Sequence, residues 1–282
     1  MSYRKYHIKN KIHRIKPQKP IFVNLWFWIV ILIIIIFLTL VYFLFFYPGF
    51  QVQNIIISGN QKVETLQLQN VVSREVNRKI FALGPIRVFS KSILFVDKNS
   101  LTTGLLKDFP AIDTLAIKIK FPHTLALDIF ERKPVGIFCP STGSGQASER
   151  CFFVDGAGII FEELSGIPDN MFIVRQEKTN GLEAVEGQNV VGQDVIDAIL
   201  KIQKELTDKF KINIKEALVA TPIRLDIKTG EGWQIYFDLS SGLGIDMQVA
   251  KLNLLLKNDI TPHVRKTLQY IDLRFKDRAY YK

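Results

Sequence analysis

One uncharged, apolar run constrains this chain more than any other feature. From Ile21 to Phe50 no residue carries a charge, and no second stretch of this kind occurs in the 282 residues. A helix rises about 1.5 Å per residue, so the roughly 30 Å hydrocarbon core of a bilayer needs about 20 apolar residues. We therefore predict a single transmembrane helix over residues 21–47, which Pro48 and Gly49 end.

The charges around this run predict its orientation. Residues 1–20 contain seven Lys or Arg and no Asp or Glu, and the next charged residue after the run is Lys62. The positive-inside rule places this basic tail in the cytoplasm and the chain from residue 50 onward outside. A cleaved signal peptide is the alternative. Its apolar core would span about 7–15 residues, and residues 47–50 lack the small residues of a cleavage site.

A basic tail is also typical of nucleic-acid binding. Here the basic residues have a simpler explanation. They set the orientation of the adjacent span and are attracted to anionic lipid headgroups. Beyond residue 20 the chain holds 30 basic against 27 acidic residues, so no large basic field remains. We expect a membrane partner and no nucleic-acid partner.

The only two cysteines, Cys139 and Cys151, enclose a loop rich in Gly and Ser. Strand-like runs lie on both sides, so a hairpin would set the two cysteines opposite each other. Two alternatives are open. One is a disulfide, worth about 3 kcal/mol for a loop of this length in the chain-entropy model. The other is two unpaired thiols, since a sequence does not fix the Cβ geometry that a bridge requires.

The exterior part divides into two units by its pattern. The order strand, helix, helix, strand, strand over residues 50–132, with a connector at 80–92, predicts helices on one face of a three-stranded sheet. Residues 133–282 show short strands, a tight hairpin turn at Asp155-Gly156, two helices and an alternating strand near 270–281. The expected class is an α+β exterior: a small βααββ domain, then a larger β-rich domain that ends on an edge strand.

Signatures of catalysis and of metal binding are missing from the exterior sequence. No Ser in residues 50–282 precedes a Lys by three positions, no HExxH motif occurs, and His123 and His263 are the only exterior histidines. The acidic pair Glu162-Glu163 is adjacent, so in a strand the two carboxylates point to opposite faces. We expect no catalytic residue, no metal site and no cofactor.

An ordered set of short motifs resembles the FtsQ/DivIB cell-division family. The segments VQNIIISGNQKVETLQL and ILFVDKNS, with FPHTLALDIFERKPV, are similar to its POTRA domain. CFFVDGAGIIFEE and the ending YIDLRFKDRAYYK are similar to the first hairpin and last strand of its β-domain. Phe121 stands where that family often has Trp, the connector is long, and the cysteine loop looks like an insertion. The resemblance implies four parts: 1–20 cytoplasmic tail, 21–47 transmembrane helix, 50–132 POTRA domain and 133–282 β-domain.

The resemblance also implies a role. It predicts a non-catalytic bitopic scaffold of the bacterial divisome, in the cytoplasmic (inner) membrane at the septum, without a small-molecule substrate. Its expected partners are coiled-coil membrane proteins of the FtsB/DivIC and FtsL types. Two alternatives are a membrane-anchored cell-wall enzyme and a POTRA-bearing assembly factor for outer-membrane barrels. The second would show repeated POTRA units or many amphipathic strands of about ten residues.

The expected partner site is the end of the chain. A terminal strand at a sheet edge offers unpaired N–H and C=O groups to a partner strand. The residues alone leave an equal alternative, in which Lys276, Asp277 and Arg278 prevent edge pairing. The family resemblance favours the interface, with Arg274 and Phe275 as its main contacts and a structural role as the alternative for Asp272. The expected contact residues are Tyr270, Asp272, Arg274, Phe275, Arg278 and Tyr280.

Overall fold

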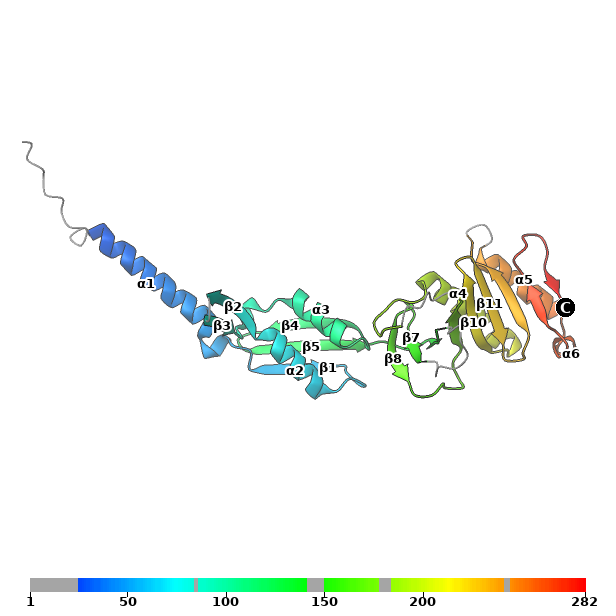
Figure 1. The fold of residues 1–282 in the computed structure, drawn as a ribbon, viewed down its shortest axis with the longest axis horizontal. Helices are drawn as coiled ribbons and strands as arrows, with labels where there is room; N and C mark the ends of the chain where they lie inside the picture. The colour runs from blue at the N-terminus through cyan, green and yellow to red at the C-terminus, as the bar shows by residue number, and fades with distance from the viewer. Residues whose placement is uncertain (1–24, 84–85, 141–149, 178–183, 241–243) are drawn as a thin grey trace, which may run out of the picture.

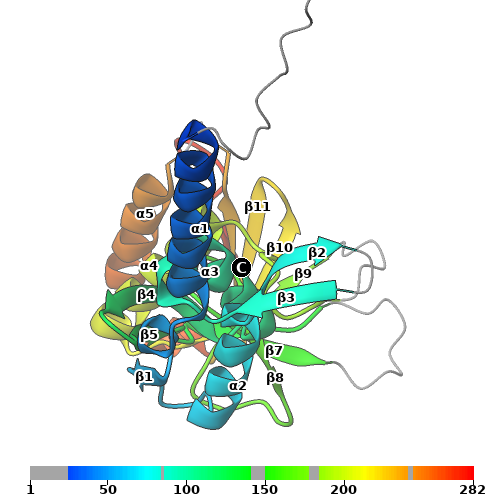
Figure 2. The same ribbon diagram turned by 90° about the vertical axis from the view of Figure 1, so that its left-hand side faces the viewer.

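The computed structural model is an elongated chain of three parts in a row, with helix α1 at one end and the C-terminus at the other (Figure 1). The structure describes residues 25–83, 86–140, 150–177, 184–240 and 244–282, and of residues 78–83 and 86–90 it describes the backbone alone. The two folded parts follow one another along the axis in Figure 1, so they overlap in the end-on view of Figure 2. The protein therefore extends away from α1.

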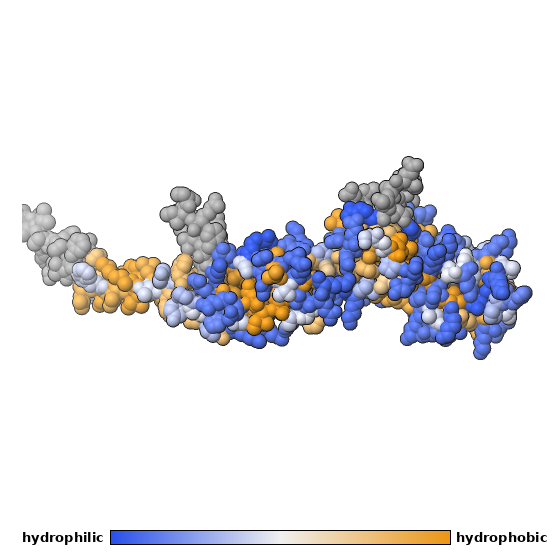
Figure 3. Space-filling model, turned by 90° about the horizontal axis from the view of Figure 1, so that it is seen from below, coloured by the Kyte–Doolittle hydropathy of each residue, from blue (hydrophilic) through white to orange (hydrophobic). Residues whose placement is uncertain are grey.

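Helix α1 (Leu25–Phe46) is long and apolar enough to cross a membrane, and none of its residues is buried by the rest of the chain. It is the one helix of this kind among the described residues. Its surface is predominantly hydrophobic (Figure 3). The helix ends before Tyr47, and a short 3-10 turn (Pro48–Phe50) follows, because Pro48 has no N–H to continue the helical bonding. Residues 21–24 of the predicted span lie outside the described part.

The first domain is a three-stranded sheet covered on one face by two helices. Its central strand β5 (Thr124–Glu131) pairs in parallel with β1 (Asn54–Ser58) and antiparallel with β4 (Ile112–Lys120). Helices α2 (Thr65–Val76) and α3 (Lys98–Asp108) supply the other half of the core. This agrees with the predicted layers. The buried core residues are Leu68, Val72, Val76, Leu101, Leu105, Ile112, Leu125, Leu127 and Ile129.

The region predicted as a connector is an additional hairpin. Strand β2 (Arg78–Leu83) pairs antiparallel with β3 (Ile86–Ser90), and the two form a small sheet of their own. The prediction of an irregular connector at 80–92 is therefore wrong. The β-branched and aromatic residues on both sides of Gly84-Pro85 were the available signal for two strands. A 3-10 turn (Ile93–Phe95) leads from β3 to α3.

The second domain is built on one nine-stranded sheet with the order β14-β13-β12-β11-β10-β9-β6-β7-β8. Strand β10 is an addition to the predicted strands, and so is the short helix α6 before the last strands. The elements are β6 (Gly136–Phe138), β7 (Cys151–Val154), β8 (Ile160–Leu164), β9 (Ile173–Gln176), α4 (Gln193–Phe210), β10 (Ile214–Thr221), β11 (Arg224–Thr229), β12 (Gln234–Asp238), α5 (Ile245–Asn258), α6 (Pro262–Arg265), β13 (Tyr270–Asp272) and β14 (Tyr280–Tyr281).

Helices α4 and α5 pack on the same face of this sheet, and over β10, β11 and β12 the opposite face is open in the described part of the chain (Figure 1). Over β6 and β7 that opposite face buries a small cluster of Ile137, Cys139 and Cys151. The strands alternate accordingly: Leu225, Ile227 and Ile235 are fully buried, while their neighbours Asp226 and Tyr236 are half-buried on the open face. The largest buried side chain, Trp233, lies in the same core with an exposure of 1%. The open face therefore carries the polar side chains that a partner could reach.

A disulfide links the first two strands of this domain. Cys139 and Cys151 are bonded, with their Cα atoms 4.4 Å apart, and both side chains are buried beside Ile137. The bond therefore joins the end of β6 to the start of β7. Residues 141–149 of the intervening loop lie outside the described part.

The two domains are joined by a nearly buried ion pair. Arg132 follows β5, and its guanidinium donates to the carboxylates of Asp155 at 2.5 Å and of Asp113 at 3.2 Å. Asp155 also accepts from the backbone N–H groups of Ala157 and Ile159, at 3.0 and 2.9 Å. The predicted tight hairpin turn at Asp155-Gly156 is present: β7 and β8 pair antiparallel, and the N–H of Gly158 donates to the carbonyl of Asp155 at 3.0 Å. The Asp155 carboxylate extends the hydrogen-bonded turn to Ile159.

From this ion pair we predict that Arg132 limits the motion of the two domains relative to each other. Arg132→Met leaves Asp155 buried without its cation, so we expect a loss of about 3 kcal/mol in the free energy of unfolding. Spin labels at Leu66→Cys and Ile223→Cys, both on exposed positions, should give a broader distance distribution in this variant. The matched control is Lys62→Met, which removes the exposed pair with Glu162 at the same junction and should change stability by less than about 1 kcal/mol. Equal effects of the two variants would contradict the assigned role of Arg132.

Candidate functional site

The C-terminal segment forms two short strands joined by a turn. β13 pairs in parallel with β12, and β14 folds back antiparallel onto β13, so β14 is the edge of the sheet. The predicted single strand near 270–281 is therefore wrong in extent, although the chain does end at a sheet edge. The polar residues Lys276, Asp277 and Arg278 lie in the turn between the two strands.

β13 belongs to the core of the second domain. Ile271 and Leu273 are fully buried, and the N–H of Leu273 donates to the carbonyl of Tyr236 at 3.0 Å. A continuous strand would place Phe275 on the face of Ile271 and Leu273, but Phe275 is 45% exposed because the chain turns away from β12 after Leu273. The segment thus combines a buried strand with an exposed turn.

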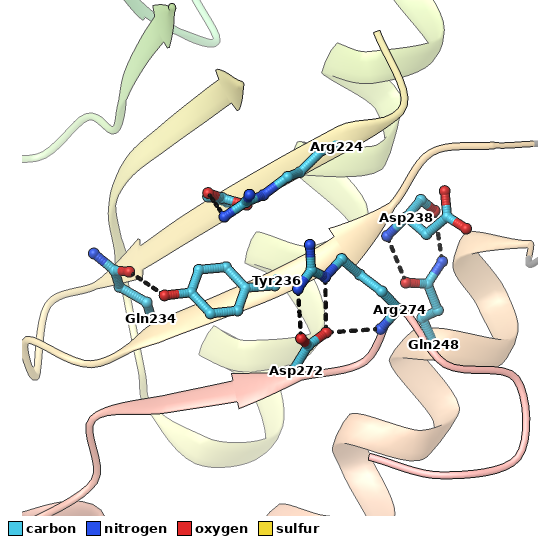
Figure 4. A network of polar contacts seen from close by, with 8 residues as sticks. Arg224, Gln234, Tyr236, Asp238, Gln248, Asp272 and Arg274 are labelled. Atoms are coloured by element: carbon cyan, nitrogen blue, oxygen red, sulfur yellow. Dashed lines mark hydrogen bonds and ion pairs between the residues drawn. The ribbon is translucent and has the colours of Figure 1, made fainter. Parts of the chain in front are cut away.

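A tyrosine between two arginines forms the centre of the open face beside β13. The ring of Tyr236 lies 5.2 Å from the guanidinium of Arg224 and 5.5 Å from that of Arg274 (Figure 4). Asp226 accepts two hydrogen bonds from Arg224, both at 2.8 Å. Asp272 accepts two from Arg274, at 2.9 and 2.6 Å. Each guanidinium is therefore held by one carboxylate through two hydrogen bonds, and this bidentate geometry fixes the orientation of its plane.

Electrostatics keep the Asp272–Arg274 pair ionised. Burial alone would raise the pKa of Asp272, but hydrogen bonds from the Arg274 side chain and backbone, and the nearby charge of Arg224, outweigh it and lower that pKa below the ordinary value. The side-chain hydrogen bond to Asp272 raises the pKa of Arg274 against the opposing effect of burial. Asp272 is only 7% exposed. Asp272 therefore serves mainly to position Arg274 and offers little surface to a partner. The side chain of Arg274 remains 35% exposed.

A lysine from α5 holds the C-terminal turn. The ammonium of Lys251 donates to the carbonyls of Leu273, Lys276 and Arg278 at 3.4, 3.3 and 3.4 Å, and it makes a closer contact with the carbonyl of Phe275. Burial lowers the pKa of Lys251 against a smaller opposing effect of an acidic residue in the turn. The converging carbonyls replace the water that this cation loses.

Three of the predicted contact residues surround the turn. The rings of Phe275 and Tyr280 meet edge to face at 5.1 Å, and each residue is 45% exposed. Arg278 donates to the Tyr280 hydroxyl at 3.3 Å. Tyr270 lies apart from them, with its ring 5.8 Å from that of Tyr236. The six predicted residues thus fall into two groups, one on the open face and one at the turn.

The edge strand presents free backbone groups. Lys282 and Tyr270 exchange backbone hydrogen bonds at 3.2 and 3.3 Å. Because pairs alternate along antiparallel strands, the N–H and C=O of Tyr281 point away from β13. No neighbouring strand covers this side of β14 in the described part of the chain. The edge therefore offers one donor and one acceptor beside the aromatic turn.

Sequence reasoning missed four residues of this surface. Arg224 and Tyr236 come from strands that the last segment reaches only through parallel pairing, and Lys251 comes from the intervening helix. The order strand, helix, strand was the available signal, because parallel neighbours need a crossover connection. The fourth, Tyr281, was included in the expected strand but not among its contact residues.

One further concave site has a different character. A cleft of about 710 Å³ lies at the start of α4, with the aliphatic residues Val190, Val195 and Val219 in its lining and Glu177 at its rim. Among the described residues, no group of three or more His, Cys, Asp and Glu is placed to hold a metal ion. The surface at β12–β14 thus remains the strongest candidate for function.

Comparison with known proteins gives a modest likeness. No family model matches the chain. It is 27% identical over 110 residues to the cell division protein FtsQ of Rickettsia typhi and 26% identical over 110 residues to that of Rickettsia prowazekii. Each match covers 39% of this chain and about a third, 34% and 33%, of the length of these relatives.

The lysine contacts predict how the turn is stabilised. Lys251→Met removes the cation and keeps much of the aliphatic stem, so the carbonyls of the turn lose their donor. We expect hydrogen exchange of the amides at 276–280 to rise about tenfold, as the loss of about 1.4 kcal/mol of local stability would give. Lys204→Met, an exposed lysine on α4, is the control. Unchanged exchange in the Lys251 variant would show that the turn does not depend on this contact.

The lowered pKa of Asp272 predicts a pH dependence. Between its folded and unfolded pKa values the unfolded chain binds more protons, so the contribution of this carboxylate to stability is complete above the unfolded value. It disappears as the pH falls through the lower folded value. We expect the wild type to exceed Asp272→Asn in urea unfolding at pH 7 and to lose that advantage below about pH 4. An advantage that is constant down to pH 2 would contradict the assignment.

Proposed function

From its likeness to FtsQ, we propose that this FtsQ-like chain is a non-catalytic bitopic scaffold of the bacterial divisome. It acts at the septum in the cytoplasmic membrane, with the basic tail inside and residues 50–282 outside. The named relatives indicate a cell division protein. The single candidate span and the charge of residues 1–20 support the location and the orientation. The first domain, in this proposal, is the POTRA unit of the scaffold.

The partners in this proposal are the FtsB/DivIC-type and FtsL-type coiled-coil membrane proteins, which bind by adding a strand to β14. One observation carries this: the outward N–H and C=O of Tyr281 at an uncovered sheet edge. Main-chain bonds at such an edge supply affinity, and neighbouring side chains supply specificity. Here the exposed rings of Phe275 and Tyr280 suit an apolar side chain, and the exposed face of Arg274 suits a carboxylate.

The alternative that Lys276, Asp277 and Arg278 guard the edge has less support. These three residues lie in the turn, whereas a charge that blocks pairing belongs on the edge strand itself. β14 carries two exposed tyrosines. The edge strand β14 has only two residues, and a short edge limits unspecific strand pairing. A partner strand at such an edge needs side-chain contacts in addition to the backbone hydrogen bonds.

The choice of variant decides how informative a binding test is. Removal of residues 271–282 would delete Ile271 and Leu273 from the core, so lost binding could reflect lost folding. Tyr281→Pro removes only the outward donor, since the ladder between β13 and β14 uses Lys282 and Tyr270 instead. Tyr281→Ala keeps the donor and removes the side chain.

We expect Tyr281→Pro to weaken partner binding at least about tenfold, because a hydrogen bond is lost and the proline ring obstructs the approaching strand. The full chain in detergent is mixed with its FtsB/DivIC-type and FtsL-type partners, and the dissociation constant is measured. Tyr281→Ala should change it less than Tyr281→Pro. Unfolding midpoints of both variants should match the wild type within about 2 °C. Full binding by Tyr281→Pro would exclude strand addition at this edge.

A further inference from the structure

The end of α1 is docked onto the first domain rather than linked to it by a free tether. The hydroxyl of Ser92 donates to the carbonyl of Leu44, in the last turn of the helix, at 3.0 Å. The ring of Phe95 stacks on that of Phe45, with centroids 4.2 Å apart and parallel planes. The backbone N–H of Val52 donates to the carbonyl of Lys91 at 2.9 Å. Side chains and backbone thus fix segment 91–95 against the helix.

This docking sets the depth of segment 92–95 relative to a bilayer. The 22 residues of α1 extend about 33 Å, which exceeds a hydrocarbon core of about 30 Å by only a few ångströms. Leu44 and Phe45 therefore lie at the boundary between acyl chains and headgroups. Tyr42 and Tyr47 flank them, as is typical of an interfacial aromatic belt. Groups in direct contact with Leu44 and Phe45 must lie at the same level.

The side chains of this segment suit that level. Ile93 is fully buried in the domain and holds the segment in place, while Leu94 and Phe95 are 39% and 46% exposed. Lys91 is exposed next to them. Apolar side chains that face outward next to a cation are typical of a surface that enters the interface and meets phosphates.

The neighbouring hairpin lies at the same end of the first domain. Strands β2 and β3 lie beside the end of α1 and project sideways from the long axis of the molecule (Figure 2). The sequence from 78 to 91 holds four basic and no acidic residues. Positive charge at a bilayer surface favours anionic headgroups.

We propose that the outer-leaflet lipids bind segment 92–95, with Leu94 and Phe95 inserted at the acyl–headgroup boundary. Contact with the bilayer thereby fixes the orientation of the first domain relative to the membrane surface. The transmembrane helix and this domain then form one unit with a fixed orientation to the membrane. The occupant is lipid, because the depth is set by contacts with the span itself. This inference is independent of the strand-addition site at the far end of the molecule.

The test uses the full chain in nanodiscs of phosphatidylcholine and phosphatidylglycerol, without any partner protein. A nitroxide is attached at Leu94→Cys, and at Leu66→Cys as the control, an exposed leucine of the same domain. The native cysteines are bonded and buried and should not react. We expect the label at position 94 to be accessible to oxygen and protected from a water-soluble nickel chelate, and the label at position 66 to show the opposite. Equal nickel accessibility at both positions would overturn the proposal.

A second measurement tests this orientation itself. The distance from a label at Leu66→Cys to headgroup fluorophores is compared between the wild type and the variant Leu94→Ser, which leaves the stacking of Phe95 on Phe45 in place. We expect a broader distribution in the Leu94→Ser variant, with its unfolding midpoint unchanged because Leu94 is exposed. An identical distribution would show that lipid contact does not orient the domain. Protection of position 94 that appears only after a partner membrane protein is added would assign the surface to that protein and would also overturn the proposal.

Discussion

The parallel pairing of β13 with β12 is the interaction on which the candidate site depends. It brings residues 270–272 back beside 234–236 after the chain has passed through α5 and α6. Burial of Ile271 and Leu273 stabilises this return, because two fully buried aliphatic side chains contribute roughly 3–6 kcal/mol of transfer free energy. Without it, β14 would have no strand to pair with and Arg274 would not reach Tyr236.

The last thirteen residues of the chain divide their tasks between buried and exposed groups. The apolar side chains of β13 hold the segment in the core, and Asp272 orients Arg274. Lys251 on α5 fixes the turn by donating hydrogen bonds to the backbone carbonyls of the turn. These fixed parts leave the aromatic rings and the edge of β14 to solvent, so a partner strand would meet a surface that is already ordered. Binding then loses less conformational entropy than it would with a flexible tail.

The same logic applies at the opposite end of the molecule. Ser92 and Phe95 fix the first domain to α1, and Arg132 fixes it to the second domain. Each junction uses contacts between side chains that are distant in the sequence. The chain therefore extends from the end of α1 to the edge at Tyr281 as a series of docked parts. Such junctions limit how far the position of the edge varies relative to α1, because a free linker would spread it.

The sequence by itself determined the long apolar helix α1, the helices-on-sheet architecture of the first domain and helix α4, because each rests on local length or periodicity. It also indicated that the chain ends at a sheet edge. Only the tertiary structure decided which groups accompany that edge: Arg224, Tyr236 and Lys251 come together through a crossover. Hairpin β2–β3 and the turn after Leu273 were likewise missed. Periodicity reports which face of an element is buried, but the neighbours of a face depend on pairing between distant segments, which the packing of the whole core decides.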